Sequence, residues 1–365
     1  MALSAFLGAG PMSGALMSGA LMAAPPGATS QPAESTVVAG LIRADEWAQY
    51  RDRFIISGRV VDNANGDITH SESQGYGMML AVMADDSATF SALWGFVRSQ
   101  MMVRDDGLTA WRWHPATRPH VTDINNATDG DILIAGALLL GANAWEKPEL
   151  AAAARTIMNA VAGNTVIRAG GQTLLLPGVE GFHRGARPDA PVINPSYWVF
   201  EALALFAKHR PQQPVWQKLT ESGLMLIDHT SFGPAGAPSE WVSVRDAARP
   251  RPAAGFNAEY GYNALRIPLY LMRAGIDDRP RLARFRKLWS RNGQHAPAII
   301  DIHSGRSRYD LDDSGYAMIV ASLDCALDGT PIPETLRRFS PALYYPSTLH
   351  LLGLSLVRQR YPQCL

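Results

Sequence analysis

The sequence predicts an all-α protein, because apolar residues recur at helical spacing from residue 41 almost to the C-terminus. About eleven or twelve such segments follow one another in hairpin-like pairs, and few stretches alternate as a half-buried strand would. No internal repeat of fixed period is visible, so the sequence does not indicate a simple solenoid. With 365 residues and 47% hydrophobic content, the chain can form one large domain or two ordinary ones.

The N-terminal stretch differs in composition from the rest of the chain. It contains mostly Ala, Gly, Ser, Met, Leu and Pro, and no basic residue precedes Arg43. An apolar run that ends at Ala24 is typical of an export signal, although the positive start of such a signal is missing. We therefore expect residues 1–36 to be a signal-like or disordered segment of a periplasmic or secreted protein, and residues 37–365 to form a single domain. No later stretch has the roughly 18 uninterrupted apolar residues of a transmembrane helix.

Turn and capping residues predict where the helices begin. Asp85 and Asp86 precede one helical segment and can cap it, and Thr128 or Asp129 can cap another. Pro148 suits the first turn of a third helix. A Gly-rich stretch at 165–182 is expected to be extended. Helices are expected at 41–55, 75–84, 88–102, 129–145, 148–161, 195–209, 214–229, 262–274, 280–291, 314–327 and 345–360.

A single carboxylate, Glu72, lies just ahead of a strongly apolar helical run. Gly75 and Gly77 lack a Cβ, so another segment or a ligand can approach this run closely. A carboxylate at the boundary between an apolar wall and a cleft is partly desolvated, which raises its pKa toward the range that a general acid needs. The alternative is that Glu72 merely complements the dipole of the helix.

A second segment with acidic residues precedes the apolar run through Leu140. It is Asn125-Asn126-Ala127-Thr128-Asp129-Gly130-Asp131. Helix capping would explain these acids as well. Together with His70-Ser71-Glu72-Ser73-Gln74-Gly75-Tyr76-Gly77-Met78, Ile193-Asn194-Pro195-Ser196-Tyr197 and Tyr262-Asn263-Ala264-Leu265-Arg266-Ile267-Pro268, it resembles glycoside hydrolase family 8. These are inverting β-glucanases, and the resemblance is greatest to the periplasmic cellulases associated with bacterial cellulose synthesis. It extends from about Trp47 to near the C-terminus.

The resemblance implies an (α/α)6 barrel, with six inner helices, six outer helices and a substrate groove across one end. It also implies a catalytic role for the single domain: Glu72 as the general acid and Asp129 at the central subsite. Asp131, two residues further along the helix, is expected to point elsewhere and to support the loop. In an inverting enzyme a second carboxylate activates water about 6.5–9.5 Å from the acid.

Asn263 departs from the family pattern. The matching motif of the cellulose-synthesis members has Asp here as the general base, and an amide is too weak a base to replace it. One interpretation is that another carboxylate is the base, as the family resemblance allows, with Glu240, Asp246, Glu259 and Asp129 as candidates. Alternatively, Asn263 only positions the water and the rate is low, or the protein has lost hydrolysis and is a glucan-binding component of a cellulose-export assembly.

Sugar binding needs flat apolar faces and polar partners for the hydroxyls. Residues of these kinds fall at predicted loops and helix ends, although core packing explains any single aromatic residue equally well. Arg266 would orient the base-side network or pair with an acid. The predicted substrate-binding residues are Tyr76, Trp111, Trp113, Asn126, Tyr197, Tyr262 and Arg266.

The net charge of +0 and the pI of about 7.1 do not favour nucleic acid as a partner, and a neutral polysaccharide fits better. The predicted substrate is a β-1,4-glucan; xylan, chitosan and mixed-linkage glucan remain open, and the cellulose synthase export machinery is a further possible partner. The motifs of zinc hydrolases, serine hydrolases and dinucleotide-binding folds are absent, so no metal or organic cofactor is expected. Cys325 and Cys364 are the only cysteines, and the sequence leaves open whether they pair.

Overall fold

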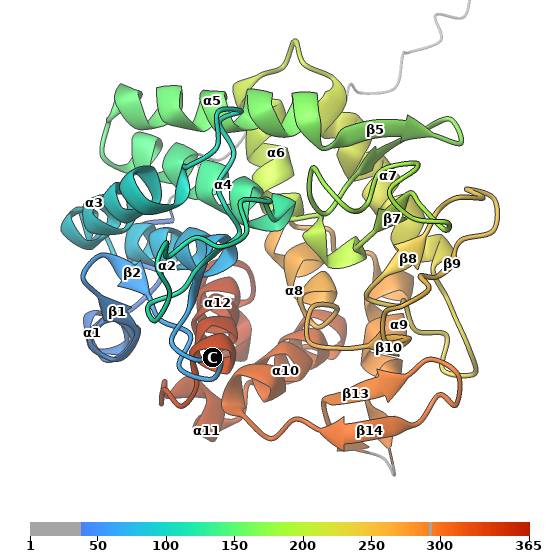
Figure 1. Ribbon diagram of the computed structural model, residues 1–365. Coiled ribbons are helices and arrows are strands. Elements are labelled where there is room, and N and C mark those ends of the chain that lie inside the picture. The colour runs from blue at the N-terminus through green and yellow to red at the C-terminus, as the bar shows by residue number, and fades with distance from the viewer. Residues whose placement is uncertain (1–37, 292–293) are drawn as a thin grey trace, which may run out of the picture. The chain divides into compact units, whose positions relative to one another are not determined.

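The computed structural model describes residues 38–291 and 294–365 (Figure 1). The predicted signal-like segment, residues 1–36, lies outside the described residues. The remainder, Val37–Leu365, is one compact unit. Within its described part are twelve α-helices and fourteen strands, none of the strands longer than four residues. The prediction of an all-α protein is therefore confirmed.

Six of the helices form an inner ring. Each contacts the next one along the ring, and the last contacts the first, which closes it (Figure 1). Every residue of α8 is buried, and in α2 every residue except Glu72 is buried. The ring consists of α2 (Ser71–Met83), α4 (Thr128–Ala144), α6 (Phe200–His209), α8 (Arg266–Arg273), α10 (Ser314–Asp328) and α12 (Tyr344–Arg360).

The other helices pack outside this ring and bury only part of their surface. In α1, α3, α5, α7 and α9, the buried residues recur every three or four positions, which is the pattern of a helix with one apolar face. Each contacts an inner helix that is next to it in the sequence or, for α1, the C-terminal α12. This alternation confirms the (α/α)6 barrel. The outer helices are α1 (Ala44–Phe54), α3 (Ser87–Phe96), α5 (Pro148–Asn164), α7 (Val215–His229), α9 (Arg279–Leu288) and the short α11 (Glu334–Arg337).

Short antiparallel strands connect the ends of the helices. The hairpin at 166–175 confirms the extended stretch predicted after α5, whereas the three-stranded sheet of β10, β13 and β14 was not predicted. Its strands are too short to show a clear alternation. The sheets are β1–β2 (Ile55–Ile56, Arg59–Val60), β3–β4 (Thr69–His70, Arg112–Trp113), β5–β6 (Val166–Ala169, Gln172–Leu175), β7–β8–β9 (Val192–Ile193, Val242–Ser243, Arg251–Pro252), β10–β13–β14 (Glu259–Tyr260, Ala298–Asp301, Ser307–Asp310) and β11–β12 (Ser290–Arg291, Gln294–His295).

Capping contacts explain which predicted helix starts were correct. Asp86 caps α3 by accepting a hydrogen bond from the backbone of Thr89 at 2.9 Å, and Pro148 occupies the first turn of α5, both as predicted. The predicted cap of α4 was wrong. Its N-cap is Ala127, because the hydroxyl of Thr128 donates to the carbonyl of Leu176 at 2.7 Å instead.

Two helices near the site begin at positions that the periodicity did not predict. Helix α2 starts at Ser71, before the predicted residue 75, so Glu72 lies within its first turn. Helix α8 starts at Arg266 rather than at 262, because the backbone N–H of Asn263 donates to the Glu240 carboxylate at 2.6 Å and the segment before α8 forms turns.

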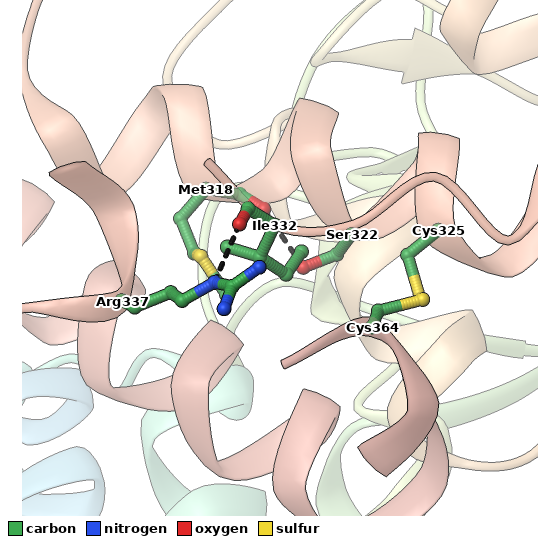
Figure 2. The surroundings of a disulfide bond; sticks show 6 residues. All are labelled: Met318, Ser322, Cys325, Ile332, Arg337 and Cys364. Atoms are coloured by element: carbon green, nitrogen blue, oxygen red, sulfur yellow. Dashed lines mark hydrogen bonds between the residues drawn. A yellow bond between two sulfur atoms is a disulfide. The ribbon is translucent and has the colours of Figure 1, made fainter. Parts of the chain in front are cut away.

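A disulfide joins Cys325 in α10 to Cys364 after α12 (Figure 2). The carbonyl of Cys364 also accepts a hydrogen bond from the backbone of Ile332 at 2.8 Å, and Arg337 donates to the carbonyl of Ile332 at 2.7 Å. The disulfide therefore attaches the C-terminal segment to α10, and the Ile332–Cys364 hydrogen bond attaches it to the α10–α11 connection.

Candidate active site

A buried arginine brings the two acidic motifs together. Arg266, the first residue of α8, is 0% exposed. Its Nη1 donates to Glu72 Oε1 and, at 3.2 Å, to Asp129 Oδ2. Its Nη2 donates to Ser196 Oγ at 3.2 Å and to Asn263 Oδ1 at 3.1 Å. One guanidinium thus joins residues of all four segments that carry the family resemblance.

Two glycines allow the N-terminal turns of α2 and α4 to approach each other this closely. A Cβ on Gly75 would lie 2.5 Å from the Cβ of Leu133, as the absence of a side chain at this position led us to expect. A Cβ on Gly130 would lie 2.0 Å from Ser71 Oγ and 2.7 Å from the backbone nitrogen of Glu72. Glu72 and Asp129 are therefore near each other because both helices lack side chains where they touch.

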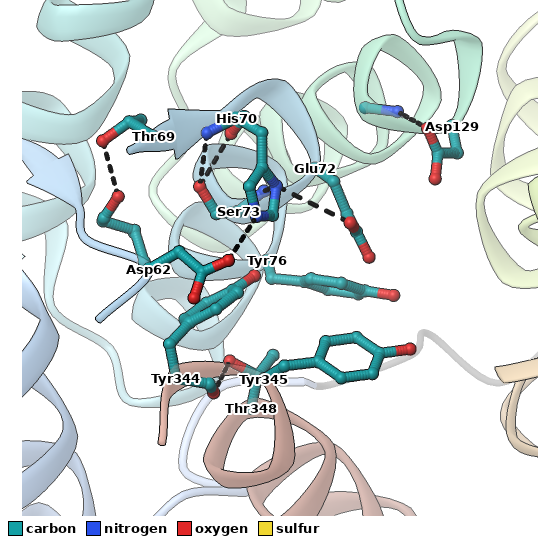
Figure 3. Close-up of polar contacts among 12 residues, drawn as sticks. Asp62, Thr69, His70, Glu72, Ser73, Tyr76, Asp129, Tyr344, Tyr345 and Thr348 are labelled. Carbon is teal, nitrogen blue, oxygen red and sulfur yellow. Dashed lines mark hydrogen bonds and ion pairs between the residues drawn. The ribbon is translucent and has the colours of Figure 1, made fainter. Parts of the chain in front are cut away.

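Glu72 is partly accessible, as the sequence predicts for a general acid. Its side chain is 18% exposed, although the rest of α2 is buried. Oε1 is bound by Arg266, and Oε2 lies 3.6 Å from His70 Nδ1. Figure 3 shows the imidazole of His70 between the carboxylates of Asp62 and Glu72, with the ring of Tyr76 below the carboxylate of Glu72. Glu72 thus keeps one oxygen free of the arginine.

His70 links this oxygen to a third carboxylate. Its Nδ1 accepts a hydrogen bond from the backbone of Ser73 at 3.1 Å, which caps α2, and its Nε2 lies 3.4 Å from Asp62 Oδ2. Burial lowers the pKa of His70, but the hydrogen bond to Asp62 and the charges of Glu72, Asp62 and Asp129 together raise this pKa above its ordinary value. These acids therefore outweigh the effect of burial on the pKa of His70.

Asp129 is almost completely buried and shares Arg266 with Glu72. Burial raises its pKa to about 6, against the opposing effect of the Arg266 charge. Two oxygens that accept from one nitrogen are at most about two hydrogen-bond lengths, roughly 6 Å, apart. This is shorter than the ~6.5–9.5 Å between the acid and base of an inverting glycosidase. The position of Asp129 therefore fits a subsite residue better than the base.

Asp131 has the supporting role that the sequence predicts. It is completely buried and accepts hydrogen bonds from the backbone and hydroxyl of Thr109, at 2.9 and 2.8 Å, and from Asn126 Nδ2 at 2.9 Å. Burial raises its pKa to about 7, although these hydrogen bonds oppose the shift. Asp131 thus fastens the segment before β4 to the start of α4.

Among the candidate bases, Glu240 hydrogen-bonds to Asn263, the residue that replaces the Asp of the family motif. Its Oε1 accepts from the backbone N–H of Asn263, and its Oε2 accepts from Asn263 Nδ2 at 3.3 Å. Burial raises the pKa of Glu240 above its ordinary value, against the effect of the hydrogen bonds from Asn263. Glu259 instead pairs with Arg308 at 3.2 Å, and Asp246 is exposed on the loop between β8 and β9.

Four predicted substrate-binding residues are buried, which leaves little of their surface for direct contact with a sugar. Tyr76 is 0% exposed and its hydroxyl bonds to that of Tyr270; Arg266 is equally buried and binds the carboxylates. Asn126 bonds to Asp131 and to the backbone of Val179. Trp113 stacks on His120, with ring centroids 4.1 Å apart. Periodicity could not reveal this burial, because it depends on which neighbouring segments cover each side chain.

Three predicted aromatic residues do retain accessible surface. Tyr262 is 43% exposed, and Trp111 and Tyr197 are half-buried. The guanidinium of Arg266 lies 6.0 Å from the ring centroid of Tyr197, so this ring is beside the carboxylates. Trp111 donates a hydrogen bond to Asp123 at 2.8 Å. These three rings remain predicted sugar-stacking faces.

An aromatic cluster that the sequence did not point out adjoins the site. Trp241, which directly follows Glu240, lies 6.2 Å from Tyr197 and stacks between Phe182, at 5.5 Å, and Phe256, at 4.5 Å. All four rings are partly exposed. We call Tyr197, Trp241, Phe182 and Phe256 the aromatic shelf. The position of Trp241 next to a candidate base was the only sequence signal that could have identified it.

The part of the chain that the structure describes contains no group of three or more His, Cys, Asp or Glu side chains that could hold a metal ion. None of its helices combines the length and the hydropathy that a bilayer span requires.

Comparisons with known proteins identify the family of the chain. Residues 25–359 match the family described as Glycosyl hydrolases family 8. A protein of Novacetimonas hansenii named "Probable endoglucanase" is 35% identical over 343 residues, covering 93% of this chain and 96% of that protein. The structure of an endo-β-1,4-glucanase from Acetobacter xylinum is similar with a TM-score of 0.79 and 32% identity, covering 88% of this chain and 99% of that one. A family 8 endoglucanase from Klebsiella pneumoniae gives 0.78 and 30%, covering 87% and 99%.

Proposed function

Because the chain belongs to Glycosyl hydrolases family 8 and is a glycoside hydrolase, we propose that it is an inverting endo-β-1,4-glucanase that cleaves cellulose or nascent glucan chains. The endoglucanase names of its relatives favour glucan over xylan or chitosan. Family membership also favours hydrolysis over a non-catalytic role in glucan binding. The partly exposed Glu72, tied through Arg266 to Asp129, supports the proposal most directly.

In this proposal Glu72 is the general acid. It donates a proton to the glycosidic oxygen from Oε2, the oxygen that Arg266 does not bind. Arg266 fixes the direction of the carboxylate, and Asp129 contacts the sugar at the central subsite. Burial of Asp129 raises its pKa to about 6, so this carboxyl group retains a proton more readily than an ordinary aspartate.

Glu240 is the proposed general base. Asn263 is partly exposed, lies between Arg266 and Glu240, and hydrogen-bonds to both. A water molecule held by the amide of Asn263 would lie next to Glu240, which then accepts its proton as the water attacks the anomeric carbon. Asn263 thus positions the water, and the carboxylate missing from the family motif is supplied by the preceding loop.

We further propose that the protein works in the periplasm or outside the cell. The Cys325–Cys364 disulfide supports this location, because disulfides persist mainly in oxidising compartments. Association with a cellulose-export assembly stays a prediction.

Reducing-end release from carboxymethyl cellulose tests the acid. Glu72→Gln keeps the size of the side chain but removes the transferable proton, so kcat should fall by about 10²–10⁴-fold. Glu221→Gln removes a carboxylate from the exposed face of α7 and should leave kcat unchanged. Equal, background-level release by the wild type and Glu72→Gln would end the hydrolase assignment and support the binding component.

The stereochemistry of the first product tests inversion. NMR spectra recorded during hydrolysis of a cello-oligosaccharide should show the α-anomer of the new reducing end first, because water attacks the face opposite the leaving group. Initial appearance of the β-anomer would indicate retention and exclude the proposed roles of Glu240 and water.

A further inference from the structure

Three arginines line a cavity at the end of the aromatic shelf. The cavity has a volume of about 460 Å³ and is formed by the loop before β7 and the segment that follows β8. Arg184, Arg187 and Arg245 line it together with small or apolar residues, and no acidic residue does. Its volume lies within the range of small-ligand sites, about 300–1,000 Å³. We call it the arginine pocket.

Two of these arginines carry uncompensated charge. Arg187 pairs with Asp189 at 2.7 Å, whereas Arg184 and Arg245 have no carboxylate partner among residues 38–291 and 294–365. The whole chain has a formal net charge of +0, so this local excess of positive charge is not a reflection of its composition. A pocket with unpaired guanidinium groups attracts an anion, and carboxylates fit the planar guanidinium especially well.

Hydrogen bonds fix the walls of the arginine pocket before any ligand arrives. Asp189 Oδ2 accepts from the backbone of Ala254 at 2.7 Å, and the hydroxyl of Ser243 donates to the carbonyl of Asp189 at 2.5 Å. Nη1 of Arg245 donates to the carbonyl of Pro188. The loop that carries Arg184 is therefore held against β8 and β9, and the pocket needs little reorganisation to bind a ligand.

The aromatic shelf connects this pocket with the catalytic carboxylates. Arg266 lies beside Tyr197, Tyr197 contacts Trp241, and Trp241 stacks on Phe256. At the far end, the guanidinium of Arg187 lies 4.6 Å from the ring centroid of Phe256. A glucan chain that lies along the exposed edges of these rings would lead from the cleavage site to the arginine pocket.

We propose that the arginine pocket is a subsite for a carboxylate-bearing sugar residue of the glucan substrate, with Arg184 and Arg245 as its anion-binding residues. This rests on the proposed function, since the shelf is assigned to a glucan chain. The pocket would let the enzyme prefer acidic or acid-substituted glucans over neutral ones. Arg187 is paired with Asp189 and stacked on Phe256, so it forms part of the wall of the pocket and its charge is already compensated.

Equilibrium binding to the non-hydrolysing Glu72→Gln protein tests the subsite. The probes are cellohexaose and an oxidised cellohexaose. In the oxidised probe, C6 of either the non-reducing or the reducing terminal residue is a carboxylate. Glu72→Gln should bind the oxidised probe more tightly, and this preference should shrink as salt is added. Adding Arg184→Gln and Arg245→Gln should weaken binding of the oxidised probe by about tenfold or more and leave binding of cellohexaose unchanged.

The control removes the same charge elsewhere. Arg98→Gln and Arg338→Gln, two exposed arginines outside the pocket, should leave the preference for the oxidised probe intact. Binding of neutral cellohexaose shows in every variant that the protein is folded. No preference in the Glu72→Gln protein, or a preference that survives loss of both pocket arginines, would overturn the proposed subsite. Failure of all proteins to bind cellohexaose would instead contradict the proposed glucanase function.

Discussion

The contacts of Arg266 explain how four separate motifs form one site. Its guanidinium is completely buried and bonds to Glu72, Asp129, Ser196 and Asn263. Removal of one partner from a buried ion pair costs about 3–5 kcal/mol, because the remaining charge has no compensation. Arg266 is thus as important for keeping the two carboxylates together as for orienting them.

The role of Glu240 can be tested by removing its carboxylate and introducing a carboxylate at position 263. Glu240→Gln should lower kcat on carboxymethyl cellulose by about 100-fold or more, since the attacking water loses its proton acceptor. Adding Asn263→Asp to this variant places a carboxylate at the position that the family motif uses. The kcat of the double variant should be about tenfold higher than that of Glu240→Gln.

Glu259→Gln serves as the control for this experiment, because Glu259 is paired with Arg308 and should not affect kcat. Full activity of Glu240→Gln would exclude Glu240 as the base, and a large loss in Glu259→Gln would transfer the assignment to that residue.

The buried carboxylate of Asp131 should make the protein less stable as the pH rises. Its pKa is about 7 in the folded protein and 3.8 as the ordinary value, so between these values the folded state holds more protons than the unfolded state. The free energy of unfolding should therefore fall with rising pH, by at most about 1.4 kcal/mol per pH unit for one group.

Urea unfolding at pH 5 and pH 8 measures this effect. Asp131→Asn should show a smaller loss of stability between the two pH values than the wild type, whereas Asp105→Asn, at an exposed carboxylate, should show the same loss. Identical pH dependence in Asp131→Asn and the wild type would contradict the prediction.

At the scale of elements, the contact between α2 and α4 determines where the catalytic side chains lie. Gly75 and Gly130 occupy this contact, and in both cases a Cβ would overlap the facing helix. The first turns of the two helices carry Glu72 and Asp129. A small change in the distance between the helices therefore changes the relation between the two carboxylates.

Gly130→Ala should separate these helices. The added methyl group would collide with Ser71 Oγ and the backbone of Glu72, so we expect a loss of about 1–3 kcal/mol in unfolding free energy and a lower kcat on carboxymethyl cellulose. Gly163→Ala is the matched control, because no atom lies within 4 Å of a Cβ at this position of α5. It should be neutral or stabilise by up to about 1 kcal/mol. Equal effects of both substitutions would argue against close packing at Gly130.

At the scale of the whole molecule, closure of the ring depends on contacts between its first and last parts. Helix α12 contacts both α1 and α2, and Arg358 in α12 pairs with Glu46 in α1. The hydroxyl of Tyr50 in α1 bonds to Thr348 in α12 at 2.8 Å. The disulfide then fastens the segment that follows α12 to α10.

Loss of the disulfide should therefore destabilise the protein. The two cysteines are 39 positions apart, and closing a loop of this length stabilises the folded state by about 4 kcal/mol in the chain-entropy description. Cys325→Ser/Cys364→Ser should lower the midpoint of urea unfolding, while a reducing agent should shift the wild type toward this variant and leave the variant unchanged. An unchanged midpoint in the double variant would show that the bond adds no stability.

The sequence by itself predicted most helices, an extended stretch after α5, Glu72 just ahead of an apolar helix and Asp131 as a supporting acid. These features depend on local periodicity, capping residues and motif spacing, which are properties of short stretches of chain. The motifs also led to the family resemblance and, through it, to the (α/α)6 ring. Only the family resemblance indicated where the expected base was missing.

The tertiary structure alone decided which side chains meet and which are buried. Glu72 and Arg266 are 194 positions apart, and Asp129 and Arg266 are 137 apart, so no local pattern could show that one guanidinium binds both acids. Burial of Tyr76 and Trp113, the aromatic shelf and the arginine pocket likewise result from segments packed together from distant parts of the chain. A side chain's exposure is set by its neighbours in space, and these are known only once the ring of helices has closed.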